Sequence, residues 1–281
     1  MTPHLVDLHL HTTASDGRCT PRELVTAAAA GGVSVMAVTD HDTTEALVEA
    51  RAAAGEVGID VVAGIEITAV EAGRDIHILG YFVDPDRAGL AVFLAAQRAS
   101  RVARVEAIAE RLAALGMPIA SGPLLEQARR QPGRSIGRPQ VARAMVDAGH
   151  VADIREAFDR WLGGDRPGFV PRSGPAPEAV IEVIHRAGGV ASLAHPGKSR
   201  VESRIRGLRD AGLDALEVFH PDHDPALVDH YARLAADLNC LMTGGSDFHG
   251  DPGHGSAPGS VSLPQSHWER LRDHPRPHAS R

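Results

Sequence analysis

Two histidines one residue apart, His9 and His11, lie near the start of the chain in the segment Asp7-Leu8-His9-Leu10-His11. In an extended strand alternate side chains share a face, so both imidazoles point the same way while Leu8 and Leu10 pack into apolar surroundings. Two imidazoles at the end of a strand supply half of a metal site. A strand that merely carries two histidines would show the same pattern, so the later parts of the chain have to distinguish these interpretations.

Seven further residues of metal-binding type occur at or near the ends of predicted strands, or in the loop after the first strand. They are Asp16, His41, Glu66, His77, His195, Asp247 and His249. The carboxyl ends of the strands form the face on which a βα barrel builds its active site. Nine nitrogen and oxygen ligands are too many for one tetrahedral ion and are enough for two or three ions. Imidazole and carboxylate favour Zn, Mn or Fe over Ca, which prefers oxygen throughout.

Several of these residues also have an explanation that needs no metal. Asp16 with Gly17 can form a simple turn, and Glu66 can be a surface charge at the end of a strand. Asp247 can cap a helix, and His77 can be a core histidine with satisfied hydrogen bonds. If all of these explanations held together, most of the strands would carry a ligand-type residue by accident. We therefore expect a metal site.

The segments that position these residues alternate between strands and helices. Strands are predicted at residues 7–11, 33–38, 60–67, 76–83, 190–194, 215–219 and 240–243, with a last short strand at 260–263. Helices are predicted at residues 21–30, 43–57, 177–187, 202–211 and 225–237, with a closing helix at 268–271. This alternation predicts an α/β fold with a parallel sheet or barrel.

Residues 85–173 interrupt the alternation. A long amphipathic helix at 89–115 is followed by shorter helices at 124–130, 139–147 and 153–162, which predicts an all-helical insertion. The α/β part would then comprise residues 1–84 and 174–272. The tail, residues 273–281, is predicted to be disordered.

The composition suits one large α/β domain or a domain that carries an insertion. The 281 residues are 43% hydrophobic, have a formal net charge of −7 and include two cysteines, Cys19 and Cys240. The acidic charge argues against capture of duplex DNA, and two cysteines exclude a disulfide framework or a cysteine-rich zinc site. The start has no basic region followed by an apolar run, and no segment is long enough to span a bilayer. We therefore expect a cytoplasmic protein without a membrane partner.

The candidate ligands lie in a series of motifs. These are Asp7-Leu8-His9-Leu10-His11 with Ser15-Asp16-Gly17, Thr39-Asp40-His41-Asp42, Gly64-Ile65-Glu66, His77, Ala194-His195-Pro196 and Gly245-Ser246-Asp247-Phe248-His249. In this order the motifs resemble those of the polymerase and histidinol phosphatase (PHP) superfamily of metal-dependent phosphoesterases. The resemblance implies a distorted seven-stranded βα barrel of the TIM-like kind, with a trinuclear metal site and the helical insertion over its mouth.

The resemblance also implies a division of the ligands among the ions. His9, His11, Glu66 and Asp247 would hold one ion, Asp16, His41 and His249 a second, and Glu66, His77 and His195 a third, with Glu66 as a bridge. The residues expected to be catalytic are Asp16, His41, Glu66 and Asp247. Two or three divalent ions in such a cluster, whether Mn, Fe or Zn, would lower the pKa of a bound water and hold phosphate oxygens for in-line attack.

A second motif lies within the predicted insertion. The segment 135–140 places Ser135, Gly137 and Arg138 just before a helix with Pro at its first turn, where free backbone N–H groups and the helix dipole favour an anion. It resembles the phosphate-recognition segment of the branch that includes 3′,5′-nucleoside bisphosphate phosphatases and related 5′-to-3′ exoribonucleases. Members of this branch usually have His in place of Gln140, which can donate a hydrogen bond but carries no charge.

The candidate substrate-binding residues are Ser135, Arg138, Gln140, Arg172, Lys198 and His220. Lys198 and His220 follow strand ends, so either could neutralise a phosphate or protonate a leaving oxygen. The alternative interpretations are an ordinary helix start with an exposed Arg138, a solvated Lys198 and a packed His220.

Together these features predict a metal-dependent phosphatase that hydrolyses a phosphomonoester of a small nucleotide, with the 3′-phosphate of nucleoside 3′,5′-bisphosphates as the first choice. The alternatives are a 5′-to-3′ exonuclease on short single-stranded oligoribonucleotides, a histidinol-phosphate phosphatase and a non-catalytic metal-stabilised binding module. The insertion argues against histidinol phosphate, and the complete ligand set argues against the binding module. The sequence leaves the oligomeric state open.

Overall fold

The computed structural model describes residues 4–199, 201–251 and 256–276. Seven strands form one sheet in the order in which they occur along the chain. They are β1 (Leu5–Leu10), β2 (Val33–Val38), β3 (Asp60–Glu71), β4 (Arg74–Tyr81), β5 (Val190–Leu193), β6 (Ala215–Phe219) and β7 (Leu241–Gly244). The strands β1 to β3 are parallel, as are β5 to β7, whereas β4 is antiparallel to both of its neighbours. The predicted α/β class and the seven-stranded sheet are confirmed.

The hairpin between β3 and β4 interrupts the parallel arrangement that the alternation up to residue 67 predicts. The predicted strand ended at residue 67, but β3 continues to Glu71, and the two residues Ala72-Gly73 lead directly into β4. Two residues cannot provide the crossover connection that parallel neighbours need, so β4 has to run in the opposite direction. The first half of β4 therefore lies beside the last half of β3, with His77 opposite Thr68.

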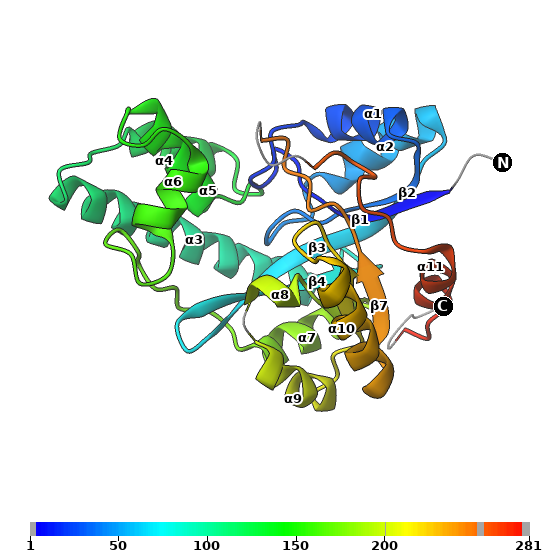
Figure 1. Ribbon diagram of the computed structural model, residues 1–281. Coiled ribbons are helices and arrows are strands. Elements are labelled where there is room, and N and C mark those ends of the chain that lie inside the picture. The colour runs from blue at the N-terminus through cyan, green and yellow to red at the C-terminus, as the bar shows by residue number, and fades with distance from the viewer. Residues whose placement is uncertain (1–3, 200, 252–255, 277–281) are drawn as a thin grey trace.

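Helices cover the sheet and connect most of its strands (Figure 1). They are α1 (Pro21–Ala30), α2 (Leu47–Val57), α7 (Pro177–Arg186), α8 (Pro196–Ser199), the 3₁₀-helix η2 (Glu202–Arg204), α9 (Ile205–Asp210), α10 (Pro225–Asp237) and α11 (Gln265–Arg272). Helix α1 begins as predicted, with Pro21 in its first turn and reciprocal hydrogen bonds between Thr20 and Glu23. Buried residues of α1, α2, α7, α9 and α10 share one core with the strands. In a second core, Trp268 and Leu271 of α11 pack against strand residues.

The remaining helices follow β4 in the chain, and most of them gather beside the end of α3 that lies away from the sheet (Figure 1). They are α3 (Ala88–Ala114), α4 (Ser121–Arg130), α5 (Arg138–Asp147), α6 (Ile154–Ala157) and the π-helix η1 (Phe158–Leu162). Leu90 and Leu94 near the start of α3 pack in the barrel core, whereas Ile108 and Leu112 pack with the other insertion helices. One continuous helix thus connects the insertion to the barrel.

Side-chain and loop contacts join β1 to β7. No hydrogen-bonded ladder connects these two strands in the part of the chain that the structure describes. The buried Asp7 carboxylate instead accepts hydrogen bonds from the backbone N–H groups of Ser246 at 2.9 Å and Gly259 at 2.8 Å. The His11 N–H donates to the Phe248 carbonyl oxygen at 3.0 Å. The barrel is therefore closed through the loop that follows β7, which lies against β1.

Two predicted boundaries were wrong for reasons that the hydrogen bonds show. No strand forms at 260–263, because Leu263 N donates to Val6 O while the Val6 N–H is bound by the Ser262 hydroxyl. The helix predicted from about residue 43 begins at Leu47, after a turn in which Leu47 N donates to Thr44 O, and the Thr43 hydroxyl donates to Gly133 O instead. The helices predicted at 153–162 and 202–211 are each divided in two, as α6 with η1 and η2 with α9.

The predicted disordered tail falls partly outside the described residues, which end at residue 276. Within them, the Arg276 guanidinium carbon lies 4.4 Å from the centre of the Phe82 ring. None of the helices in the described part of the chain combines the length and the apolar composition that crossing a bilayer requires.

Candidate metal centre

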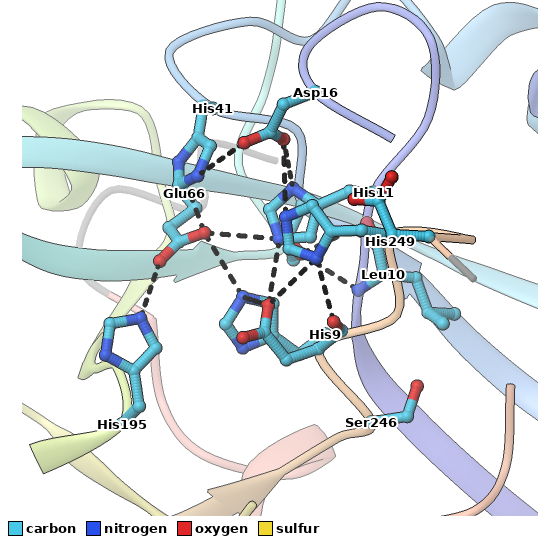
Figure 2. A network of polar contacts seen from close by, with 12 residues as sticks. His9, Leu10, His11, Asp16, His41, Glu66, His195, Ser246 and His249 are labelled. Carbon is cyan, nitrogen blue, oxygen red and sulfur yellow. Dashed lines mark hydrogen bonds and ion pairs between the residues drawn. The ribbon is translucent and has the colours of Figure 1, made fainter. Parts of the chain in front are cut away.

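The Glu66 carboxylate lies at the centre of a group of imidazoles (Figure 2). Its Oε1 is 2.8 Å from His77 Nδ1 and 3.1 Å from His195 Nε2. Its Oε2 lies 3.2 to 3.3 Å from a nitrogen of three further histidines, His9, His11 and His41. Glu66 comes from β3, and its neighbours come from β1, β4 and the segments after β2 and β5. Since no sequence segment supplies more than two of these groups, the barrel has to assemble them.

Two more carboxylates flank the group. Asp16 Oδ1 lies 3.3 Å from His249 Nε2 and 3.6 Å from His11 Nδ1, and Asp16 Oδ2 lies 3.5 Å from His41 Nε2. The second carboxylate, Asp247, has its Oδ1 3.3 Å from a nitrogen of His9 and 3.4 Å from one of His11. The structure therefore brings all nine predicted ligands into one cluster.

The ligand atoms fall into three overlapping groups whose members lie within 4.8 Å of one another. These are His11, Asp16, His41 and His249, then His9, His11 and Asp247, and then His41, Glu66 and His77. The grouping resembles the three ion sites implied by the sequence, but His11 and His41 each belong to two groups. The assignment of each ligand to one ion stays a prediction.

The cluster has the polar atoms that a divalent metal would need. Both ring nitrogens of His11, and Nδ1 of His41 and His77, are buried and form no hydrogen bond within the described residues, although carboxylate oxygens lie 2.8 to 3.6 Å from them. An imidazole nitrogen left this way in a protein interior is costly, and a metal ion can satisfy it. The set of neutral nitrogen donors and carboxylates therefore suits divalent metal ions of the Mn, Fe or Zn type.

The electrostatics of the cluster also favour a cation. Burial raises the pKa of Glu66, but His41, His77 and His9 outweigh this effect and hold the pKa well below its usual range, so the carboxylate is ionised. Burial lowers the pKa of His11, but Asp247 and Glu66 outweigh it and raise the pKa to about 10. This buried imidazole would hold a proton where no metal is bound, so a metal ion would take the place of that proton.

The backbone around the ligands is strained. His195 and Asp247 have φ angles of 29° and 49°, in a left-handed region that costs non-glycine residues of order 1–3 kcal/mol. Gly245 and Gly17 are needed for close approach, because a Cβ atom would meet His9 N at 2.3 Å in the first case and His11 O at 2.4 Å in the second. Strain of this kind persists where surrounding contacts define a functional geometry.

The comparisons with known proteins agree with this geometry. A model of the PHP domain matches residues 7–105. The 5′-3′ exoribonuclease Rnm of Escherichia coli is 35% identical over 252 residues, which cover 87% of this chain and 85% of the relative. The 3′,5′-nucleoside bisphosphate phosphatase of Chromobacterium violaceum is 33% identical over 255 residues, with 89% and 88% covered. The chain belongs to the PHP family.

Two further relatives extend this conclusion. The phosphoribosyl 1,2-cyclic phosphate 1,2-diphosphodiesterase of Eggerthella lenta is 34% identical over 250 residues, with 87% of this chain and 94% of the relative covered. A solved structure from Bifidobacterium adolescentis, assigned to the metal-dependent phosphoesterases, has a TM-score of 0.87 and 33% identity, with 96% of both chains covered. This PHP-family member is therefore a metal-dependent phosphoesterase, and the alternative of a non-catalytic binding module is not supported. The activities named for its relatives differ, so they leave the substrate open.

Sequence reasoning missed one carboxylate beside the PHP ligands. Glu217 on β6 is fully buried, with Oε1 2.8 Å from His9 Nδ1 and Oε2 accepting a hydrogen bond of 2.7 Å from the backbone N–H of His195. Burial raises the pKa of Glu217, but His9 and His220 outweigh it and lower the pKa, so the group is ionised. An ionised carboxylate only accepts hydrogen bonds, which directs His9 Nε2 at the cluster. The sequence signal that could have identified Glu217 is that it is the single charged residue inside the apolar strand Ala215–Phe219.

A cavity of about 430 Å³ adjoins the candidate metal ligands. Four arginines line it: Arg101, Arg104, Arg138 and Arg172. Asp42 binds Arg101 at 2.5 Å and Arg172 at 3.2 Å, and Asp75 binds Arg104 at 2.8 Å and Arg138 at 3.0 Å. Burial lowers the pKa of Arg138 and of Arg172 to about 10, so both remain charged at neutral pH.

The six predicted substrate-binding residues divide into two groups. Arg138, Arg172 and Lys198 line this cavity, and Lys198 Nζ lies 2.8 Å from Asp222 and 3.7 Å from Asp247. The other three, Ser135, Gln140 and His220, are buried outside its lining. All six roles stay predictions.

Proposed function

We propose that this PHP phosphoesterase removes the 3′-phosphate of nucleoside 3′,5′-bisphosphates. The observation that carries the proposal is the charge of the cavity beside the metal ligands. Four arginines line it, and their ion pairs are with two aspartates, Asp42 and Asp75, so this group of six residues has an excess of two positive charges, to which Lys198 of the lining adds a third. A dianionic phosphate would balance the excess of the arginine group, while the candidate metal ligands and Lys198 would lie at the second, scissile phosphate.

The size and lining of the cavity support a nucleotide. Its volume of about 430 Å³ falls within the range of 300–1,000 Å³ that small-molecule sites usually have. Phe158 lines it and is half-buried, with the Arg138 guanidinium carbon 5.7 Å from the centre of its ring. Phe158 opens the π-helix η1, and π-helical turns are frequent at functional sites. Its ring would offer the nucleobase a stacking surface.

Different residues of the chain would have different roles in the reaction. Bound divalent ions would act as Lewis acids on the phosphate oxygens and activate a water. Glu66 and Asp247, both ionised, would keep the ions beside one another. Lys198 would hold a proton near the leaving 3′-oxygen, because Asp247 and Asp222 outweigh the effect of burial and raise its pKa. The arginines would hold the 5′-phosphate in place.

Steady-state kinetics on matched substrates test this proposal. Adenosine 3′,5′-bisphosphate should be hydrolysed with a higher kcat/KM than adenosine 3′-phosphate, which lacks the second phosphate, and than histidinol phosphate. Arg138→Met should remove one charged contact of roughly 1.5–3 kcal/mol and lower kcat/KM for the bisphosphate by about 10- to 150-fold, while the value for the 3′-phosphate changes little. Arg130→Met, at an exposed arginine of α4, is the matched control. Equal loss on both substrates would contradict the proposal.

A second cavity favours one other substrate, a short oligoribonucleotide from which nucleotides are removed at the 5′ end. This cavity has a volume of about 900 Å³ and shares Pro139, Phe158, Lys198, Asp247 and His249 with the first. A bisphosphate would occupy the first cavity alone, whereas a longer strand could continue into the second from the same scissile phosphate.

The exposed Arg155 lines only the second cavity and so separates the two substrates. Arg155→Glu should lower kcat/KM for a 5′-phosphorylated trinucleotide and leave that for adenosine 3′,5′-bisphosphate unchanged. A wild-type enzyme that releases no mononucleotide from the trinucleotide would rule out the second substrate.

A further inference from the structure

Helix α5 of the insertion holds the loop that carries Asp16. Three successive carbonyl groups of this loop each accept a hydrogen bond from the insertion. The Ser135 N–H donates to Ala14 O at 2.8 Å, the Gln140 Nε2 donates to Ser15 O at 2.7 Å, and the Arg143 Nη2 donates to Asp16 O at 2.5 Å.

The barrel holds the opposite side of the same loop. The buried Asp40 carboxylate accepts hydrogen bonds from Thr12 N at 2.8 Å, from the Thr12 hydroxyl at 2.6 Å and from the Ser15 hydroxyl at 2.5 Å. The loop that carries Asp16 is therefore hydrogen-bonded to the barrel on one side and to the insertion on the other. Removing the insertion contacts would free only one side of the loop, so the barrel could still fold around Asp40.

Arg143 also reaches the second loop of the cluster. Its Nη2 lies 3.0 Å from Asp251 Oδ2, and Asp251 is two residues beyond the candidate ligand His249. Arg18, which follows the Asp16 loop, forms an ion pair with the same Asp251. The backbone N–H of Arg18 donates to His249 O at 2.8 Å. One helix of the insertion is thus bonded to both chain segments that bring Asp16 and His249 together, at 3.3 Å from each other.

We propose that Gln140 and Arg143 are positioning residues that hold Asp16 and His249 in their metal-binding geometry. Both ends of the Gln140 amide are already used, since its Oε1 accepts from Gly137 N at 2.8 Å while its Nε2 binds Ser15 O. Gln140 is also buried outside the lining of the cavity, so we assign its amide to the Asp16 loop, while the substrate contact predicted for it from the sequence stays untested. Arg138, two residues before Gln140 on α5, lines the cavity, so the two side chains would serve the substrate and the metal site separately.

Metal titration of two variants tests this inference. Gln140→Ala removes the bond to Ser15 O, and Arg143→Lys keeps the charge but cannot reach Asp16 O and Asp251 with the same planar group. Loss of a contact that orients a ligand typically lowers metal affinity by about 10- to 100-fold. We expect a loss of this size for the weakest-bound Mn²⁺, measured by calorimetric titration of the metal-free protein. The turnover of p-nitrophenyl phosphate should recover at high Mn²⁺, with an unchanged KM.

Arg138→Met is the matched control on the same helix and should retain wild-type Mn²⁺ affinity. Circular dichroism would establish that each metal-free variant is folded, and Arg143→Lys keeps the test open if Gln140→Ala does not fold. Wild-type Mn²⁺ affinity in both variants, or a raised KM with normal affinity in Gln140→Ala, would overturn the inference. Because the readout is metal binding, a failure of the proposed nucleotide substrate would leave this result unaffected.

Discussion

The Nδ1 of His9 lies 2.8 Å from the Oε1 of Glu217, and this contact joins the first strand of the barrel to the sixth. The other carboxylate oxygen binds the backbone N–H of His195, whose positive φ needs such support. Glu217 thus orients two candidate ligands that are 186 positions apart in the sequence without contacting the cavity itself.

Replacement of Glu217 by Ala should therefore weaken metal binding by about 10- to 100-fold, since His9 loses the partner that fixes its orientation. Metal titration of the purified variant would measure the effect. Glu217→Gln should be affected less, because an amide oxygen can still accept from His9. If Glu217→Ala binds metal as tightly as the wild type, Glu217 has no positioning role.

Asp247→Ala should lower activity and metal binding more than the loss of a supporting contact does. Its carboxylate faces His9 and His11 directly, so its removal would take a candidate ligand from the cluster and one anionic neighbour from each of two buried imidazoles. We expect phosphoesterase activity to fall by more than about 100-fold and the bound metal to decrease. Activity assays and elemental analysis would measure both quantities. Asp237→Ala, at an exposed residue of α10, is the control, and full activity with full metal content in Asp247→Ala would refute the assigned role.

Removal of metal should lower the thermal stability of the protein. A metal present at 100 times its dissociation constant stabilises the folded state by about 2.7 kcal/mol, which corresponds to a Tm shift of roughly 5 °C for a chain of this size. Differential scanning calorimetry before and after dialysis against EDTA would measure the shift. Mn²⁺ or Zn²⁺ should restore the Tm, whereas Ca²⁺ should not, because it prefers oxygen ligands to imidazole. A Tm that does not respond to any of these ions would argue against a metal centre.

Phe158→Ala should separate binding of the nucleobase from the chemistry. If the ring stacks on the base, its loss costs about 1–3 kcal/mol, which corresponds to a 5- to 150-fold lower kcat/KM for adenosine 3′,5′-bisphosphate. The kcat/KM for p-nitrophenyl phosphate, which has no nucleobase, should change much less in the same variant. A parallel loss on both substrates would indicate that Phe158 supports the fold of η1 and does not bind the base.

The types and spacing of the residues in this sequence determined the candidate ligand set and the α/β class. His9 and His11 share a strand face because side chains alternate along a strand, and this local rule needs no tertiary information. In the same way, His41 and His195 could be identified because each follows an apolar run that predicts a strand. The helix start at Thr20-Pro21 was also readable, because capping depends on neighbouring residues alone.

Other features depended on contacts between distant segments, and only the tertiary structure decided them. The direction of β4 followed from where β3 ended, which its apolar pattern did not mark. The roles of Glu217 and Gln140 follow from partners 208 and 125 positions away, to which no local pattern points. His9 and His11 could be identified as a pair from the sequence, but the direction in which the His9 ring faces is set by a carboxylate on another strand. That contact exists only once the barrel has formed.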